Sequence, residues 1–225
     1  MNNLPSFVTA ITADAIALLL NQIPTATASQ LLGTAYQSWQ YKRAKEAHDI
    51  LLNEISKGQR LSNDVDPNTF FGLLHRYLNA TKQGAARANL RLMAQVLRGS
   101  LETDCPFNPD ELASNAELVA SLSRNEIKLL GSFWQANLED SSMAMINNSI
   151  APREAMVRER SCMQKLIPTI YANEEAFYAA AAALTRTGLI VAKSGYGKII
   201  YDVTSRLETL VKLCDLESAL SPNED

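Results

Sequence analysis

Histidine and cysteine, the side chains that most often hold transition metals, are scarce in this sequence. The two histidines, His48 and His75, lie far apart in helical segments, and the three cysteines form no CxxC pair. A metal site would therefore need ligands from separate helices, and we expect none. The widely spaced Cys105, Cys162 and Cys214 instead predict reduced thiols in a cytoplasmic protein, each buried as a small apolar side chain.

Catalytic and cofactor-binding motifs are missing as well. The chain has no GxSxG, P-loop, GxGxxG or HExxH sequence. These short patterns would mark a nucleophile, a phosphate-binding loop or a zinc site. We therefore expect a protein that is not an enzyme and that carries no cofactor.

Long apolar runs and a strong net charge are also absent. The apolar run Ala15–Leu20 is far shorter than the roughly 20 residues that span a bilayer. No lysine or arginine precedes it, as a secretory signal would require. We expect a core helix over residues 9–22, with a membrane-associating protein that acts through Phe7–Ile23 as an alternative. The net charge of −3 gives the whole molecule no bulk attraction to polyanions.

What the sequence does contain is a series of helix signals. A long helix predicted over residues 29–57 ends at Gly58, and its spacing predicts one buried face with Ala47, Ile50, Leu51 and Ile55. Pro67 suits the first turn of the next helix, which carries Phe70, Leu73, Leu74, Tyr77 and Leu78. A further helix ends at Gly99. The two prolines of LETDCPFNPDE place a domain boundary near residues 100–108.

The second half predicts helices, one hairpin and a closing helix. After a short helix over residues 109–121, Ser123 and Glu126 form a capping box. The helix that follows has a wide apolar face, with Trp134 as its expected core anchor: Ile127, Leu130, Phe133, Trp134 and Leu138. A helix from Pro152 ends before Pro168, and the next one is capped by Asn173 and stopped by Gly188. Two short strands flank the turn Gly195-Tyr196-Gly197, and Ser205 with Glu208 caps the last helix.

These signals predict a mainly α protein with two parts. Residues 1–104 form an N-terminal helical bundle. Residues 105–225 form an autonomous winged-helix-like domain with a short two-stranded β-hairpin. The hairpin is the wing, and its candidate contact residues are Lys193, Tyr196 and Lys198.

Three observations argue against DNA binding by this wing. Residues 101–225 hold eleven Lys and Arg against eighteen Asp and Glu, a balance of −7, whereas DNA affinity rests on cations. The helix before the wing starts with Glu174 and Glu175, where a recognition helix comes closest to the bases. Its middle, Ala179–Ala183, suits packing against another helix.

The more basic feature lies in the first half, where residues 1–100 carry a balance of +4. Arg87, Arg91 and Arg98 share one stripe of a helix, with Lys82 before it. Lys42, Arg43 and Lys45 cluster on the long helix. The stripe is interpreted either as a solvated face paired with nearby acids or as a contact surface for phosphate, RNA, DNA or the acidic half of a neighbouring copy.

The order of parts resembles a known family. The segment RYLNATKQGAARANLRLMAQVLRG is followed by a short helix and LSRNEIKLLGSF, and the chain closes with LTRTGLI, a turn and YDVTSRLETLVKLC. Over residues 70–214 this pattern resembles the bacterial abortive-infection alpha family, soluble helical proteins with a winged-helix-like end that are linked to phage resistance. The resemblance implies a role in phage defence or mobile-element biology, and it carries over no catalytic residues.

Together these observations favour a non-enzymatic, cytoplasmic protein-interaction module. We expect it to bind a protein partner or a second copy of itself. A DNA-binding regulator that uses the wing together with the basic stripe is the alternative from a different class.

Overall fold

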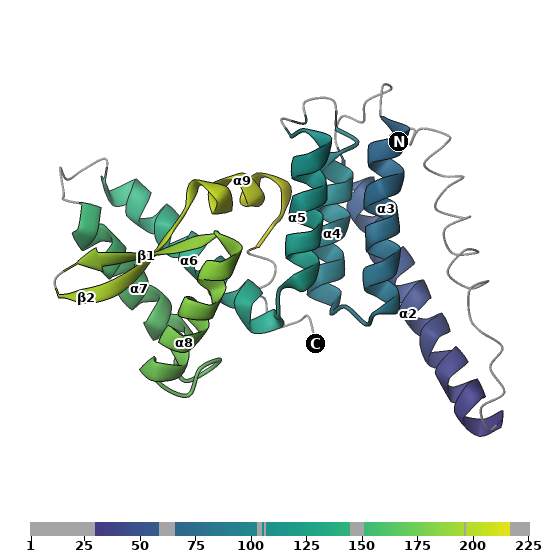
Figure 1. Cartoon of the computed structure of the whole chain (residues 1–225), viewed down its shortest axis with the longest axis horizontal. Helices are drawn as coiled ribbons and strands as arrows, with labels where there is room; N and C mark the ends of the chain where they lie inside the picture. The colour runs from purple at the N-terminus through teal and green to yellow at the C-terminus, as the bar shows by residue number, and fades with distance from the viewer. Residues whose placement is uncertain are drawn as a thin grey trace. The chain divides into compact units, whose positions relative to one another are not determined.

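The computed structural model describes residues 30–58, 66–102, 105, 107–144, 151–195 and 197–216. In this part of the chain the protein is mainly helical, with one antiparallel two-stranded sheet near its C-terminal end (Figure 1). The structure thus confirms a mainly α fold with a short β-hairpin. The helix predicted over residues 9–22, and the segment Phe7–Ile23, lie outside the described residues.

The chain divides into two compact units, with the boundary between Ser121 and Leu122. The predicted boundary lies earlier, between residues 104 and 105, and the difference is one helix. α5 (Pro109–Ser121) packs against α3 (Pro67–Lys82) and α4 (Arg87–Gly99). Asn89 of α4 donates a buried hydrogen bond to the carbonyl of Val119 in α5 (2.7 Å). The proline-containing turn breaks the helix without ending the core, so α5 belongs to the first unit.

α4 is the central helix of the first unit. It packs against α3, α5 and α2 (Gln30–Ser56), and nine of its thirteen residues are buried. The hydroxyl of the buried Tyr77 in α3 donates a hydrogen bond to the carbonyl of Ala47 in α2 (2.6 Å). The predicted inward face of α2 is confirmed, because all of its members are buried: Ala47, Ile50, Leu51 and Ile55.

Local signals explain where α3 begins and ends. Asp66 caps the helix by accepting hydrogen bonds from the backbone N–H groups of Asn68 and Thr69, and Pro67 follows in the first turn. Gly84 has a φ of 83°, a conformation that residues with a side chain rarely adopt. Gly84 therefore lets the chain turn between α3 and α4.

α2 is much longer than its neighbours. It has 27 residues, whereas α3, α4 and α5 have 16, 13 and 13. Figure 1 shows its N-terminal turns extending beyond the ends of the other three helices. From Tyr36 to Arg43 no side chain is buried, and burial begins at Ala44. Between Tyr36 and Ser56, therefore, the part of α2 that contributes to the core of the first unit begins at Ala44.

The second unit contains the predicted three helices, hairpin and closing helix. In order they are α6 (Arg124–Ala144), α7 (Ala151–Leu166), α8 (Glu174–Leu184), the 3-10 turn η1 (Thr185–Thr187), β1 (Ile190–Gly195), β2 (Lys198–Val203) and α9 (Ser205–Leu213). The strands are antiparallel, with Ile190 opposite Val203 and Gly195 opposite Lys198. α6 and α7 pack against β2, and four consecutive residues of β1 are exposed. β1 is therefore the outer strand.

The predicted helix caps of this unit are confirmed, with one exception. Ser123 and Glu126 exchange hydrogen bonds with each other's backbone N–H groups, and Asn173 accepts from the backbone N–H of Ala176. Gly188 has a φ of 69°. The exception is α9, where the side chain of Thr204, and not that of Ser205, accepts from the backbone of Leu207. Ser205 is already the first helical residue.

The prediction that Trp134 anchors the core of the second unit is wrong in part. The fully buried aromatic side chain of α6 is Phe133, which packs near Phe177 of α8 with ring centroids 6.2 Å apart. Trp134 is half-buried, and Leu138 is 44% exposed. Each residue advances a helix by about 100°, so Trp134 lies at the edge of the face that Phe133 centres.

Two of the three cysteines are buried as predicted. Cys162 and Cys214 are buried, whereas Cys105 is half-buried, and all three are free thiols. Burial raises the pKa of the Cys162 thiol to about 12. Cys162 is therefore a neutral packing residue of α7.

Candidate functional site

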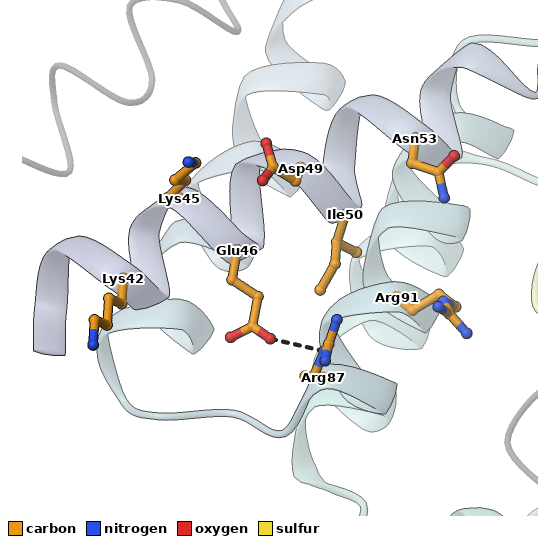
Figure 2. Close-up of a pocket in the computed structure, with 8 residues that line it drawn as sticks. All are labelled: Lys42, Lys45, Glu46, Asp49, Ile50, Asn53, Arg87 and Arg91. Atoms are coloured by element: carbon orange, nitrogen blue, oxygen red, sulfur yellow. Dashed lines mark ion pairs between the residues drawn. The ribbon is translucent and has the colours of Figure 1, made fainter. Parts of the chain in front are cut away.

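A groove of about 580 Å³ runs along α2 and α4 in the first unit (Figure 2). We call it the α2–α4 groove and define it by its lining residues: Lys42, Lys45, Glu46, Asp49, Ile50 and Asn53 of α2, and Arg87 and Arg91 of α4. Counted from Lys42, the other α2 residues follow by three or four positions or by sums of these steps, which places all six on one face of the helix. The groove is therefore built by one stripe of α2 facing the start of α4.

The lining is mostly charged. Four cationic side chains stand against the two carboxylates of Glu46 and Asp49, and Ile50 is the apolar residue. Arg87 Nε lies 2.7 Å from Glu46 Oε1, as the dashed line in Figure 2 shows. Asp49 Oδ1 lies 3.4 Å from the ring of its neighbour His48. Within the described parts of the chain, neither Lys42 nor Lys45 has an ion-pair partner within 4 Å.

A buried carboxylate organises the other end of the α2–α4 contact. Glu54 is 1% exposed. Its oxygens lie 2.6 Å from Lys57 Nζ, 3.8 Å from Arg91 Nε and 3.5 Å from Arg98 Nη1, and Gln95 Nε2 donates a hydrogen bond to it (3.3 Å). A buried charge is tolerated only with such partners. The arginines of α4 are therefore turned towards α2.

The four predicted phosphate or partner contacts do not form one surface. Arg87 and Arg91 line the α2–α4 groove. Arg98 instead pairs with Glu54 and with Glu102 (3.5 Å), and the exposed Lys82 lies at the end of α3, outside the lining. The structure thus brings two of the predicted residues together and joins them to Lys42 and Lys45.

A cluster of exposed aromatic residues lies on the same helix, before the groove. Tyr36, Trp39 and Tyr41 are 53%, 46% and 54% exposed, and we call them the α2 aromatic cluster. The rings of Tyr36 and Trp39 stack with centroids 5.9 Å apart, and the guanidinium carbon of Arg43 lies 5.6 Å from the Trp39 ring centroid. Arg43 also donates a hydrogen bond to the carbonyl of Ala85, just before α4.

This cluster is not among the residues predicted from the sequence. The available signal is the segment YQSWQYKR, which places three aromatic residues within six positions of an otherwise polar stretch. Apolar residues in a buried helix face recur every three or four positions over several turns. Here Tyr41 follows Trp39 by two positions, about 200° around the helix, so the three rings do not recur along one face as a core stripe does.

The two lysines among the predicted wing contacts have acidic neighbours within the second unit. Lys193 Nζ lies 2.7 Å from Asp202 Oδ2 across the hairpin, and Asp202 is buried and also bound by Arg158 of α7 (2.9 Å). The charge of the exposed Lys198 acts on the nearby Glu159. Tyr196 lies outside the described residues.

Glu159 of α7 is completely buried. Its Oε1 accepts a hydrogen bond from the backbone N–H of Tyr201 in β2 (3.0 Å). Burial raises the pKa of Glu159 above its ordinary value, and the Tyr201 hydrogen bond and the charge of Lys198 oppose that shift. The Glu159 carboxyl therefore binds a β2 backbone group that does not pair with β1.

The unit boundary changes the charge argument against DNA binding. Residues 122–225 hold eleven Lys and Arg against thirteen Asp and Glu, a balance of −2. The remaining acidic excess of the predicted domain lies in residues 101–121, which belong to the first unit. On α8, Glu174 and Glu175 are exposed, as are three residues of the alanine run: Ala179, Ala182 and Ala183.

Comparison with known proteins gives no relative for this chain. No family model matches it, and no curated protein or solved structure does so either. In the described part of the chain, no three His, Cys, Asp or Glu side chains are grouped so that they could hold a metal ion. Among the same residues, no helix is both long and apolar enough to cross a bilayer.

Proposed function

We propose that this protein is a non-enzymatic interaction protein that binds a protein partner through the first unit. The observation that carries the proposal is the α2 aromatic cluster, three large side chains each about half exposed within six residues. Aromatic residues are enriched at protein–protein contacts, and tryptophan and tyrosine are frequent among the few residues that dominate the binding free energy. The cluster lies on the turns of α2 that bury no side chain in the core.

Two side chains of the cluster, Tyr36 and Trp39, are held in place before any partner arrives. Tyr36 and Arg43, one turn before and one turn after Trp39, both contact its ring. Gln40 Nε2 donates a hydrogen bond to the Tyr36 hydroxyl (2.7 Å). Fixing a side chain in advance lowers the entropic cost of binding. The arrangement therefore suits a contact surface better than a set of freely rotating exposed rings would.

The hairpin argues against the alternative of a DNA-binding regulator. A lysine that neutralises a DNA phosphate must be available to it. Lys193 instead lies 2.7 Å from the buried Asp202, and the helix before the hairpin starts with two exposed glutamates. The charge balance of −2 for residues 122–225 adds less to this argument than the contacts of Lys193 do.

Phage defence is the process we propose for the interaction, on the resemblance to the abortive-infection alpha family over residues 70–214. Since no family model matches the chain, that resemblance is the only support for the process. It is independent of the α2 aromatic cluster, which supports the interaction itself.

Site-specific photocrosslinking in the native host tests the proposed interaction. A benzophenone amino acid replaces Tyr41 in one variant and Val157 in a control, because Val157 is equally exposed (54%) and lies in the second unit. We expect a discrete crosslinked protein from position 41 that position 157 does not give. The proposal fails if position 41 yields no product, or the same products as position 157.

A further inference from the structure

We infer that the α2–α4 groove binds an acidic segment of the partner protein, with the carboxylates of that segment on Lys42 and Lys45. This inference rests on the proposed function, because it assigns the chemistry of the partner to a surface beside the α2 aromatic cluster. Both surfaces lie on α2, and Trp39 precedes Lys42 by one turn. A segment seated in the groove can therefore also reach the aromatic cluster.

The charges of the groove set the sign of the ligand. The carboxylate of Glu46 is already engaged by Arg87 at 2.7 Å, which leaves Lys42 and Lys45, beside Arg91, with the single carboxylate of Asp49 in the lining. The exposed Lys42 and Lys45 have no acidic partner among the residues that the structure describes. Two unpaired ammonium groups on one helix face, one turn apart, fit two carboxylates at a similar spacing.

The same lining disfavours nucleic acid. Phosphates follow one another along a nucleic acid at regular, short intervals, so some of them would lie against Glu46 and Asp49. A protein segment can place an uncharged residue opposite those two carboxylates. Single-stranded nucleic acids also require an open aromatic face for stacking, and Tyr36 and Arg43 both take up surface of the Trp39 ring.

The dimensions of the surface set the length of the ligand. From Trp39 to Asn53 the α2 helix runs for about 21 Å, at 1.5 Å per residue. A helical ligand of about 14 residues, or an extended one of about six, covers that length. Ile50 in the lining and the half-exposed Trp39 offer apolar contacts. The expected ligand is thus an acidic segment with apolar residues on the side that faces α2.

The test uses the full chain and a fluorescein-labelled synthetic peptide of about 14 residues, in which glutamates alternate with leucines at helical spacing. Fluorescence anisotropy measures its affinity for the wild type, for the double variant Lys42→Glu with Lys45→Glu, and for the control Lys212→Glu. Lys212 is exposed on α9 in the second unit. We expect the double variant to bind at least about tenfold more weakly, because like charges replace two pairs, and the control to bind like the wild type.

A charge-swapped peptide, with lysines in place of the glutamates, sharpens the test. It should bind the double variant more tightly than it binds the wild type. Circular dichroism confirms that the variants are folded, and Lys42→Ala with Lys45→Ala replaces any variant that is not. Equal peptide affinity of wild type and double variant overturns the inference. So does a mixed-sequence single-stranded oligonucleotide that binds the wild type more tightly than the peptide and depends on the same lysines.

Photocrosslinking from position 41 separates this inference from the proposed function. If peptide binding does not depend on the lysines while position 41 still captures its discrete partner, the groove chemistry is wrong and the interaction stands. If position 41 captures nothing, the proposed function itself is wrong. If the lysine changes weaken both peptide binding and the crosslink, both proposals are supported.

Discussion

Arg158 on α7 and Asp202 on β2 form a multiply hydrogen-bonded ion pair between helix and hairpin. Arg158 Nη2 donates to both carboxylate oxygens of Asp202 (2.9 and 3.0 Å), and Arg158 Nε donates to Oδ1 (3.1 Å). Asp202 is 3% exposed. The pair fixes the strand that lies next to α7, and its removal leaves a buried charge without its main partner.

We expect Arg158→Ala to lower the free energy of unfolding by about 3–5 kcal/mol, measured by urea denaturation. Lys193→Ala is the matched control, because it removes the other cation on Asp202 from a side chain that is 53% exposed. That change should cost less than about 1 kcal/mol. Equal losses for the two variants would show that Arg158 has no special part in holding the hairpin.

Glu159 makes stability depend on pH. Its pKa in the folded protein is raised, chiefly by burial, above the ordinary value of 4.5. The stability of the wild type relative to Glu159→Gln should therefore be greatest below the unfolded-state pKa, fall as the pH rises, and level off above the folded-state pKa. The glutamine side chain of the variant keeps an oxygen for the Tyr201 N–H. Urea titrations of both proteins between about pH 3.5 and pH 8 measure the difference, and a flat difference contradicts the raised pKa.

Phe133 and Trp134 provide a direct test of which α6 side chain anchors the second unit. Phe133 is completely buried and Trp134 is half-buried. Phe133→Ala should cost about 3–5 kcal/mol, whereas Trp134→Ala should cost about 1–2 kcal/mol. Thermal or urea unfolding gives both values. A larger loss for Trp134→Ala would restore the prediction made from the sequence.

The two units should fold separately when cut between residues 121 and 122. A fragment of residues 122–225 should give a cooperative thermal transition. A fragment of residues 105–225 carries α5 without α3 and α4, so it exposes the otherwise buried Leu112 and Val119. It should bind the dye ANS more strongly and be no more stable than the shorter fragment. A longer fragment that is clearly more stable would place α5 in the second unit.

Trp39→Ala should separate binding from folding. Trp39 is 46% exposed and lies in the stretch Tyr36–Arg43, in which no side chain is buried. The change should therefore alter the free energy of unfolding by less than about 1 kcal/mol. It should nevertheless remove most of the crosslink from position 41, because a central aromatic contact is lost. An unchanged crosslink would mean that the partner contacts Tyr41 without Trp39.

Sequence patterns predicted the elements of the fold better than their grouping. The caps of Ser123 and Asn173 and the turn at Gly188 depend on neighbouring residues, and the structure contains all three. The division between the units depends instead on which distant helices share a core. The segment around residue 106 has the composition of a linker, yet α5 packs back on α3 and α4. No local signal distinguishes those two outcomes.

Only part of the candidate site was predictable from the sequence, for similar reasons. The stripe of Arg87, Arg91 and Arg98 follows from helical spacing. Whether the stripe faces solvent or α2 depends on Glu54. The sequence alone does not show which two helices this acid lies between. Only the packed structure shows that Glu54 is buried, with 1% of its surface exposed. The charged groove beyond it needed both helices to be placed together.

The uneven burial of α2 also predicts how the helix opens. Backbone amides from Ala44 onward belong to turns with buried side chains, so their hydrogen exchange should require opening of the first unit as a whole. Amides between Tyr36 and Arg43 lie in turns without a buried side chain, and the Arg43–Ala85 hydrogen bond ties this stretch to the rest of the unit at its end, so they should exchange by local fraying from the Tyr36 side. A bound partner would add protection there first. Hydrogen–deuterium exchange of the amides between Tyr36 and Arg43 would therefore report whether a partner is bound to α2.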